Sequence, residues 1–231
     1  GSISSTVSAN TTSGFSIVSY TGNATAGATV GHGLGSVPAM IIVKSRSVGD
    51  GWRVYHHKVS SDPETDYLVL NNSNAVADSN GYWNDTAPTS SVFSLGAAGE
   101  VNTNGSTNIA YCFTEIKGFS KFGIYTGNAS TDGTFVYTGF KPAFVMLKQS
   151  SGTEGWYIFD NKRDTFNLVD DALTANTSNT EITNWGVGFD FLSNGFKARA
   201  TDASINSSGG SYIYMCFAEE PLVGDNPATA R

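Results

Sequence analysis

The chain has 231 residues, of which 39% are hydrophobic, 12% aromatic and only 14% charged. A typical globular domain is about 25% charged, and the hydroxyl, amide and glycine residues that are abundant here favour turns and strands over helix interiors. The composition therefore argues against an all-helical fold. It also argues against disorder, because 4 Trp, 10 Tyr and 14 Phe are enough to fill a core.

The formal net charge of −7 argues against a nucleic-acid partner. Phosphate recognition needs a basic surface, and here 13 Lys and Arg are outnumbered by 20 Asp and Glu. No apolar run reaches the roughly 18 residues of a membrane-spanning helix. The leading Gly1-Ser2 is typical of a cloning scar and opens a polar lead over residues 1–13, so we expect the chain to be a fragment.

An internal repeat organises the rest of the chain. Residues 14–117 and 118–221 have equal length and carry the same short sequences in the same order. These include Tyr20-Thr21-Gly22-Asn23-Ala24 with Tyr125-Thr126-Gly127-Asn128-Ala129, Pro38-Ala39 with Pro142-Ala143, Gly51-Trp52 with Gly155-Trp156, and Cys112-Phe113 with Cys216-Phe217. The pattern predicts two copies of one unit, followed by a tail over residues 222–231.

The first copy is expected to consist of short strands. Alternation of apolar and polar residues predicts a half-buried strand, and a continuous apolar run opened by proline predicts a central strand buried on both faces. In chain order, strands are predicted over residues 15–20, 38–44, 52–55, 67–70 and 109–113.

The second copy repeats this succession. Strands are predicted over residues 142–148, 156–159, 173–175 and 212–217, with a hairpin over 190–199 that turns at Asn194-Gly195. Because no segment predicts a helix, the expected fold class is all-β. We expect two tandem, internally duplicated antiparallel β-sandwich units of jelly-roll or lectin-like type.

The sequence does not contain a recognisable catalytic motif. Nucleophilic catalysis needs a Ser or Cys near a His and an acid, but His32, His56 and His57 all lie in the first copy and share no motif with a nucleophile. Cys112 and Cys216 occupy corresponding strands of different copies, so we expect buried free thiols. The chain is therefore predicted not to be an enzyme, to need no cofactor and to hold no metal.

Binding is easier to motivate, because sugar rings stack on aromatic faces while amides and carboxylates take their hydroxyls. Two candidate segments place a Trp beside amides, namely Tyr82-Trp83-Asn84-Asp85 and the surroundings of Trp185. For both Trp residues the alternative is a place in the core. A third candidate is the charge cluster of Asp160, Lys162, Arg163 and Asp164, for which the alternative is a salt-bridged loop.

The second copy also resembles a known family. The resemblance is carried by Gly118-Phe119-Ser120-Lys121-Phe122-Gly123, Tyr125-Thr126-Gly127-Asn128, Gly139-Phe140-Lys141-Pro142-Ala143, Asp160-Asn161-Lys162-Arg163, Ser193-Asn194-Gly195-Phe196-Lys197 and Tyr212-Ile213-Tyr214-Met215. These segments are similar to uncharacterised duplicated β-domains found at the C-terminal ends of bacteriophage tail fibre and other virion proteins. The first copy lacks the Asp-Asn-Lys-Arg cluster, so any role of that cluster belongs to the second copy alone.

The resemblance implies a location in the virion and a non-enzymatic adhesin that recognises a host surface glycan or receptor. Other virion proteins are expected partners, and because fibres are frequently trimers a homotrimer is also expected. Two alternatives remain open, a purely structural decoration or connector module and a polysaccharide depolymerase with two carboxylates in a cleft. Burial of both Trp83 and Trp185 would favour the structural module.

Overall fold

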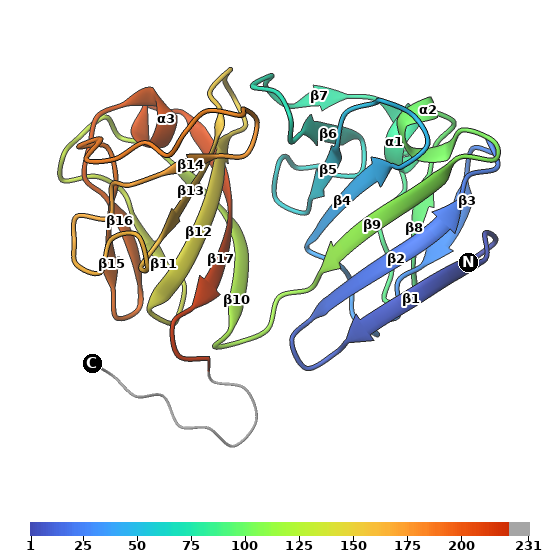
Figure 1. Ribbon diagram of the computed structural model, residues 1–231, viewed down its shortest axis with the longest axis horizontal. Coiled ribbons are helices and arrows are strands. Elements are labelled where there is room, and N and C mark those ends of the chain that lie inside the picture. Colours follow the sequence, from blue (N-terminus) through green and yellow to red (C-terminus); the bar gives the residue numbers. More distant parts are fainter. Residues whose placement is uncertain (222–231) are drawn as a thin grey trace. The chain divides into compact units, whose positions relative to one another are not determined.

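The computed structural model describes residues 1–221, which form two compact units (Figure 1). Unit 1 contains Gly1–Asn71 and Val76–Glu115, and unit 2 begins at Ile116 and includes Asn72–Ala75. Each unit has its own hydrophobic core. The division lies close to the predicted junction of residues 117 and 118, and the predicted tail over 222–231 lies outside the described residues.

The larger sheet of unit 1 has seven antiparallel strands in the order β1-β2-β9-β4-β5-β6-β7. They are β1 (Ser5–Asn10), β2 (Phe15–Thr21), β9 (Thr107–Phe113), β4 (Met40–Ser45), β5 (Arg53–His56), β6 (Asp66–Val69) and β7 (Ala77–Asp78). A second sheet pairs β3 (Ala28–Gly31) with β8 (Val92–Leu95). The core contains side chains from both sheets, such as Ile41 and Phe93.

The larger sheet of unit 2 has five antiparallel strands in the order β10-β17-β12-β13-β14. They are β10 (Ser120–Thr126), β17 (Ser211–Ala218), β12 (Pro142–Gln149), β13 (Trp156–Asp160) and β14 (Leu173–Thr174). The smaller sheet has the order β11-β16-β15, with β11 (Phe135–Tyr137), β16 (Gly195–Ala198) and β15 (Phe189–Leu192). Its core again draws on both sheets, for example through Leu147 and Phe196.

The expected all-β, sandwich-like class is therefore confirmed. Within residues 1–221 the helices are single turns, α1 (Asn80–Trp83), α2 (Gly99–Asn102) and α3 (Ala203–Asn206). None of them is long or apolar enough to cross a membrane. The predicted strands are present with ends shifted by one or two residues. The predicted hairpin is also present, although Leu192 pairs with Gly195, so its central turn residues are Ser193 and Asn194.

The two units share an order of strands. The run β2-β9-β4-β5-β6 of unit 1 corresponds to β10-β17-β12-β13-β14 of unit 2. Equivalent tyrosines support the correspondence, since Tyr20 Oη donates to the carbonyl of Val101 and Tyr125 Oη to that of Ile205, at 2.8 and 2.7 Å. A shared order is what a repeat requires, and its origin by duplication stays a prediction.

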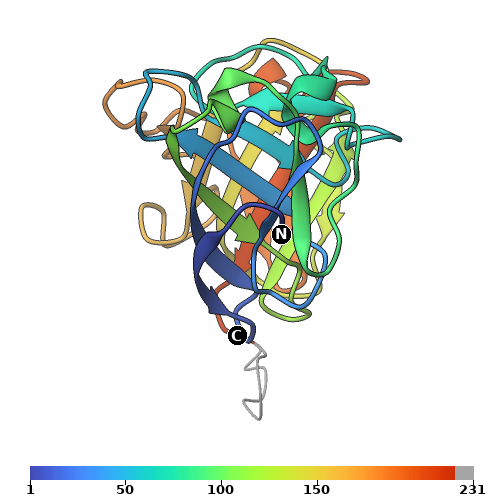
Figure 2. The same cartoon turned by 90° about the vertical axis from the view of Figure 1, so that its right-hand side faces the viewer.

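The N-terminal segment is an integral part of the fold of unit 1. The sequence predicts only a polar lead, but β1 pairs with β2 along the edge of the large sheet, and Figure 2 shows this dark-blue segment from the side. Ile3 is buried and bridges Val30 of β3. A single buried residue just before β1 is enough to anchor this exposed edge strand, because backbone hydrogen bonds provide most of its pairing.

One buried asparagine in each unit joins several loops. Asn206 Nδ2 donates to the carbonyls of Ser130 and Ala200 at 2.8 and 2.9 Å, and its Oδ1 accepts from the backbone N–H of Asn128. Asn102 does the same in unit 1, where its Nδ2 donates to the carbonyls of Thr25 and Gly96 and its Oδ1 accepts from the Asn23 N–H. Both asparagines are fully buried, so these backbone groups have little access to water.

We predict that Asn206→Ala lowers the free energy of unfolding of unit 2 by about 2–4 kcal/mol, because it leaves several buried backbone groups without partners. Chemical denaturation followed by tryptophan fluorescence measures the change. Asn179→Ala removes an exposed amide from the same unit and serves as the matched control, with an expected change below about 0.5 kcal/mol. Equal effects of the two substitutions would contradict the role of Asn206.

Candidate functional site

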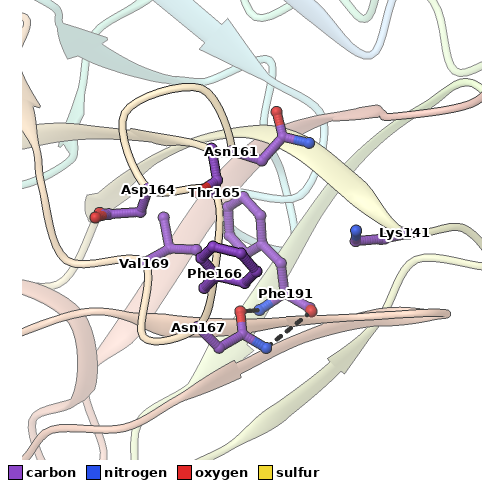
Figure 3. Close-up of a pocket in the computed structure, with 8 residues that line it drawn as sticks. All are labelled: Lys141, Asn161, Asp164, Thr165, Phe166, Asn167, Val169 and Phe191. Carbon is purple, nitrogen blue, oxygen red and sulfur yellow. Dashed lines mark hydrogen bonds between the residues drawn. The ribbon is translucent and has the colours of Figure 1, made fainter. Parts of the chain in front are cut away.

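A pocket of about 210 Å³ lies in unit 2, where the loop after β13 meets β15 and the residue before β12 (Figure 3). We call it the loop pocket. It is lined by Lys141, Asn161, Asp164, Thr165, Phe166, Asn167, Val169 and Phe191. The lining thus combines two aromatic rings with two amides, a carboxylate and an ammonium group.

Asn167 fixes the loop to the sheet. Its Oδ1 accepts from the backbone N–H of Phe191 at 2.9 Å, and its Nδ2 donates to the carbonyl of the same residue at 3.2 Å (Figure 3). The side-chain amide thereby pairs with β15 much as a neighbouring strand would. Val169 adds a second attachment, because its backbone pairs with that of Phe189. The pocket therefore has one wall held in place by backbone hydrogen bonds.

Phe166 is the most exposed large apolar side chain of the described residues, at 85%. It stands next to Asn167, whose amide is pinned, so the ring is presented from an anchored loop. Exposed apolar side chains are common one at a time, but a fully uncovered aromatic beside a polar pocket is typical of a binding surface. Phe166 is thus the feature of the loop pocket that a ligand would cover.

Two lining residues, Lys141 and Asn161, are joined by Glu219, which does not itself line the pocket. Glu219 Oε2 pairs with the Lys141 ammonium at 2.7 Å, and its Oε1 accepts from Asn161 Nδ2 at 2.9 Å. Asn161 Oδ1 is buried and accepts no hydrogen bond from the described residues. A buried acceptor without a donor is costly, and because this oxygen has almost no accessible surface it adds no contact for a ligand.

Asp164 organises the second half of the loop. Its Oδ2 accepts from the backbone N–H groups of Asp170 and Asp171 at 2.8 and 2.7 Å. Carboxylate oxygens of these three aspartates lie within 4.8 Å of one another, which is the donor set of an oxygen-ligated cation. Asp170 and Asp171 in turn accept from the N–H groups of Gly186 and Asn184. Backbone N–H groups therefore already stabilise the negative charge of the three aspartates, and these hydrogen bonds hold the loop in place.

The predicted charge cluster separates into three environments. Asp160 accepts from the N–H groups of Lys162 and Arg163 and pairs with the Arg163 guanidinium, which also pairs with Glu181. These residues therefore form the salt-bridged loop that was the alternative reading. Lys162 is exposed, and Asp164 alone among the cluster lines the loop pocket.

The candidate segment of unit 1 is mostly core. Trp83 is 2% exposed, its indole N–H donates to the carbonyl of Asp66, and its ring meets the edge of Tyr55. Tyr82 is 8% exposed and packs on Tyr67. Neither ring offers a face to a sugar, because a single turn of helix, α1, directs both inward.

Asn84 and Asp85, which follow this turn, both have positive φ, and Asp85 is exposed. They remain available at the surface but stand beside no exposed ring.

Trp185 is half-buried. It packs on the core of unit 2, parallel to Phe159 at 6.4 Å between ring centroids and tilted on Tyr157 at 5.1 Å, and part of its surface stays exposed. Its neighbours Asn184 and Gly186 both have positive φ, so the Trp is held inward between two turns. The loop pocket and Trp185 are joined through the acidic cluster, since Asp170 and Asp171 receive the amides on either side of Trp185.

The sequence reasoning missed Phe166, Asn167, Lys141 and Asn161. An aromatic residue in Thr165-Phe166-Asn167, within a polar stretch between predicted strands, was the available signal.

Three other reactive side chains, His32, Cys112 and Cys216, are buried. His32 is fully buried, with Nε2 3.1 Å from the Thr89 carbonyl and Nδ1 accepting from the Leu34 N–H. Cys112 and Cys216 are free and buried, as predicted. Burial raises the pKa of the Cys112 thiol to about 12 and that of Cys216 well above its ordinary value, so neither is a thiolate at neutral pH.

Fold and site together define an antiparallel β-sandwich protein with two similar units and a loop-built pocket on the second. The chain belongs to the family described as a domain of unknown function (DUF7483), which matches residues 1–221. The match spans both units and includes the N-terminal segment. Neither the curated proteins nor the solved structures contain a match to this chain.

We predict that Asp164→Ala loosens the loop without unfolding unit 2, because two backbone N–H groups lose their acceptor at a local cost of about 1–3 kcal/mol. Hydrogen exchange at Asp170 and Asp171 should accelerate at least tenfold. Asp164→Asn retains a side-chain oxygen acceptor and should have a smaller effect. Unchanged exchange in Asp164→Ala would show that the loop is held by other contacts.

Proposed function

We propose that the chain is a non-enzymatic adhesin domain of a bacteriophage tail fibre or related virion protein, and that it recognises a host surface glycan or receptor through the loop pocket of unit 2. The observation that carries the proposal is Phe166, which is 85% exposed on an anchored loop beside amide, carboxylate and ammonium groups. The virion location and the host partner are supported by the resemblance of the second copy to phage virion domains.

The chemistry of the pocket suits a sugar better than an apolar ligand. A pyranose ring has an apolar face that stacks on an aromatic side chain, and its hydroxyls need donors and acceptors at the rim. Phe166 would provide the aromatic face, and the Asp164 carboxylate and the Lys141 ammonium would provide an acceptor and a donor for the hydroxyls. At about 210 Å³ the pocket has room for one sugar ring rather than for a long chain.

A binding role without catalysis agrees with the surroundings of the reactive groups. The histidine His32 and both cysteines are buried, and the thiol pKa values are raised. In the pocket lining Asp164 is the carboxylate, and its Oδ2 already accepts two backbone N–H groups. A retaining or inverting glycosidase would need a second carboxylate placed across the scissile bond.

The second candidate function is a structural decoration or connector module. The burial of Trp83 favours it, because that aromatic serves the core of unit 1 rather than a ligand. Trp185 keeps part of its surface exposed, so the two Trp residues do not jointly favour this reading. Exposed Phe166 favours the adhesin, because an uncovered aromatic ring beside polar groups suits stacking on a sugar.

We predict that Phe166→Ala weakens glycan binding about tenfold or more, which corresponds to losing about 1.4 kcal/mol of stacking. Binding is measured on a microarray of bacterial surface polysaccharides and then by calorimetry with the strongest hit. Because Phe166 is exposed, the melting temperature should not change. Val48→Ala, which trims another exposed apolar side chain, is the matched control.

Two results would contradict this proposal. One is the absence of binding to any surface glycan or to whole host cells, tested both with the isolated chain and with a trimerised fusion. The other is loss of polymer viscosity on incubation with a bound polysaccharide, which would point to the depolymerase.

A further inference from the structure

Edge strand β11 of unit 2 presents two exposed aromatic rings on one face. Phe135 is 44% and Tyr137 60% exposed, while Val136 between them is buried in the core. Side chains alternate along a strand, so the two rings share the outward face. Neither belongs to the lining of the loop pocket. We call Phe135 and Tyr137 the aromatic pair.

Each ring of the aromatic pair lies against a glycine. A Cβ on Gly139 would stand 3.6–3.8 Å from Oη, Cζ and Cε1 of Tyr137, and a Cβ on Gly195 would stand 3.0 Å from Cε2 of Phe135. The missing side chains let the rings rest on the backbone. The glycine backbone supports one side of each ring, and the rest of the ring is exposed to solvent. This arrangement suits a surface on which a sugar stacks.

The equivalent place in unit 1 is covered. Gly33 follows buried Val30 by three residues, as Gly139 follows Val136, and both glycines have positive φ. A Cβ on Gly33 would meet the side chains of Val7 and Ala9 from β1, at 2.9 and 3.4 Å. Within residues 1–221, β11 pairs only with β16, so no strand covers it in this way.

The position of Tyr137 also differs between the units, since Gly31 stands there in unit 1. Unit 2 therefore has exposed rings at the place where unit 1 has a covering strand.

A positive charge stands near one ring of the aromatic pair, Tyr137. Lys121 Nζ of β10 lies 5.6 Å from the centroid of the Tyr137 ring, and Lys121 forms no ion pair with any described residue. Lys197, opposite Phe135 in the β11–β16 register, differs because it pairs with Asp132, which Arg199 also contacts. Lys121 is thus an uncompensated cation beside an exposed ring, in a chain whose net charge is −7.

We propose that the aromatic pair and Lys121 form a second carbohydrate subsite, one that selects sugars bearing a carboxylate. The pyranose ring stacks on Tyr137, its carboxylate accepts from the Lys121 ammonium, and Phe135 supports the neighbouring residue of the glycan. This inference rests on the proposed function and names its ligand class, an acidic polysaccharide. The two rings lie about 7 Å apart along the strand, which allows contact with adjacent sugar residues.

The argument for an acidic ligand is electrostatic. An exposed ion pair contributes little alone, but a carboxylate that also stacks is held in one place relative to Lys121. Charge complementarity then provides selectivity more than total affinity. A neutral glycan of the same backbone would keep the stacking and lose the pairing.

The test uses a microarray of acidic bacterial polysaccharides, each printed beside its carboxyl-reduced, neutral form. We expect at least one acidic member to bind the full chain at least tenfold more tightly than its reduced form, with affinity falling as sodium chloride rises. Lys121→Gln should abolish this preference, and Tyr137→Ala should weaken binding of the acidic member at least tenfold. Lys58→Gln, which removes an exposed lysine of unit 1, should change neither.

The outcomes separate this inference from the proposed function. Binding that Phe166→Ala weakens but that shows no acid preference, or a preference that Lys121→Gln leaves unchanged, would overturn the acidic subsite alone. Absence of binding to every polysaccharide would overturn both. Retained acid preference in Phe166→Ala, with its loss in Lys121→Gln, would support two distinct subsites.

Discussion

In each unit a buried asparagine amide satisfies backbone groups of loops that are far apart in the sequence. Asn102 joins the segment around Asn23 to the segment around Gly96, and Asn206 joins the segment around Asn128 to Ala200. A sandwich of short strands ends in many loops, and every loop brings backbone N–H and C=O groups that must find partners. One amide that donates twice and accepts once meets several of these needs at a single point, so the strands on either side keep their register.

The loop that carries the candidate site in unit 2 is not bonded to the buried asparagine, so its sequence is free to vary. The chain between β13 and β15 is held by polar side chains at three points. Asp160 and Asp164 accept from backbone N–H groups of the same segment, and Asn167 bonds to the backbone of Phe191 in β15. Its shape is therefore set by these polar residues together with Val169 and Ala172, which are buried in the core. A loop of this kind can change its exposed residues, such as Phe166, without disturbing the sheets below it.

Much of the fold could be predicted because it rests on patterns that repeat along the chain. Alternating apolar residues and the proline-opened run at Pro142 located the strands, and the matching sequences located two units. Trp83 was harder, because four residues of helix have no period to reveal which way the ring points. Phe166 and Lys141 come to line one pocket only after folding, and no local pattern separates an exposed aromatic from a buried one. The candidate site therefore had to come from the structure, whereas the class of the fold did not.

The edge strands β1 and β10 show how two similar units protect themselves against unwanted pairing. An open edge of a sheet invites another strand, and proteins block this with a covering segment or with a charged side chain. Unit 1 has the covering segment, held by Ile3. Unit 2 has Lys121 on β10, whose positive charge must stay in water. The two units therefore guard the β2 and β10 edges by different means, a paired strand in one and a charged side chain in the other.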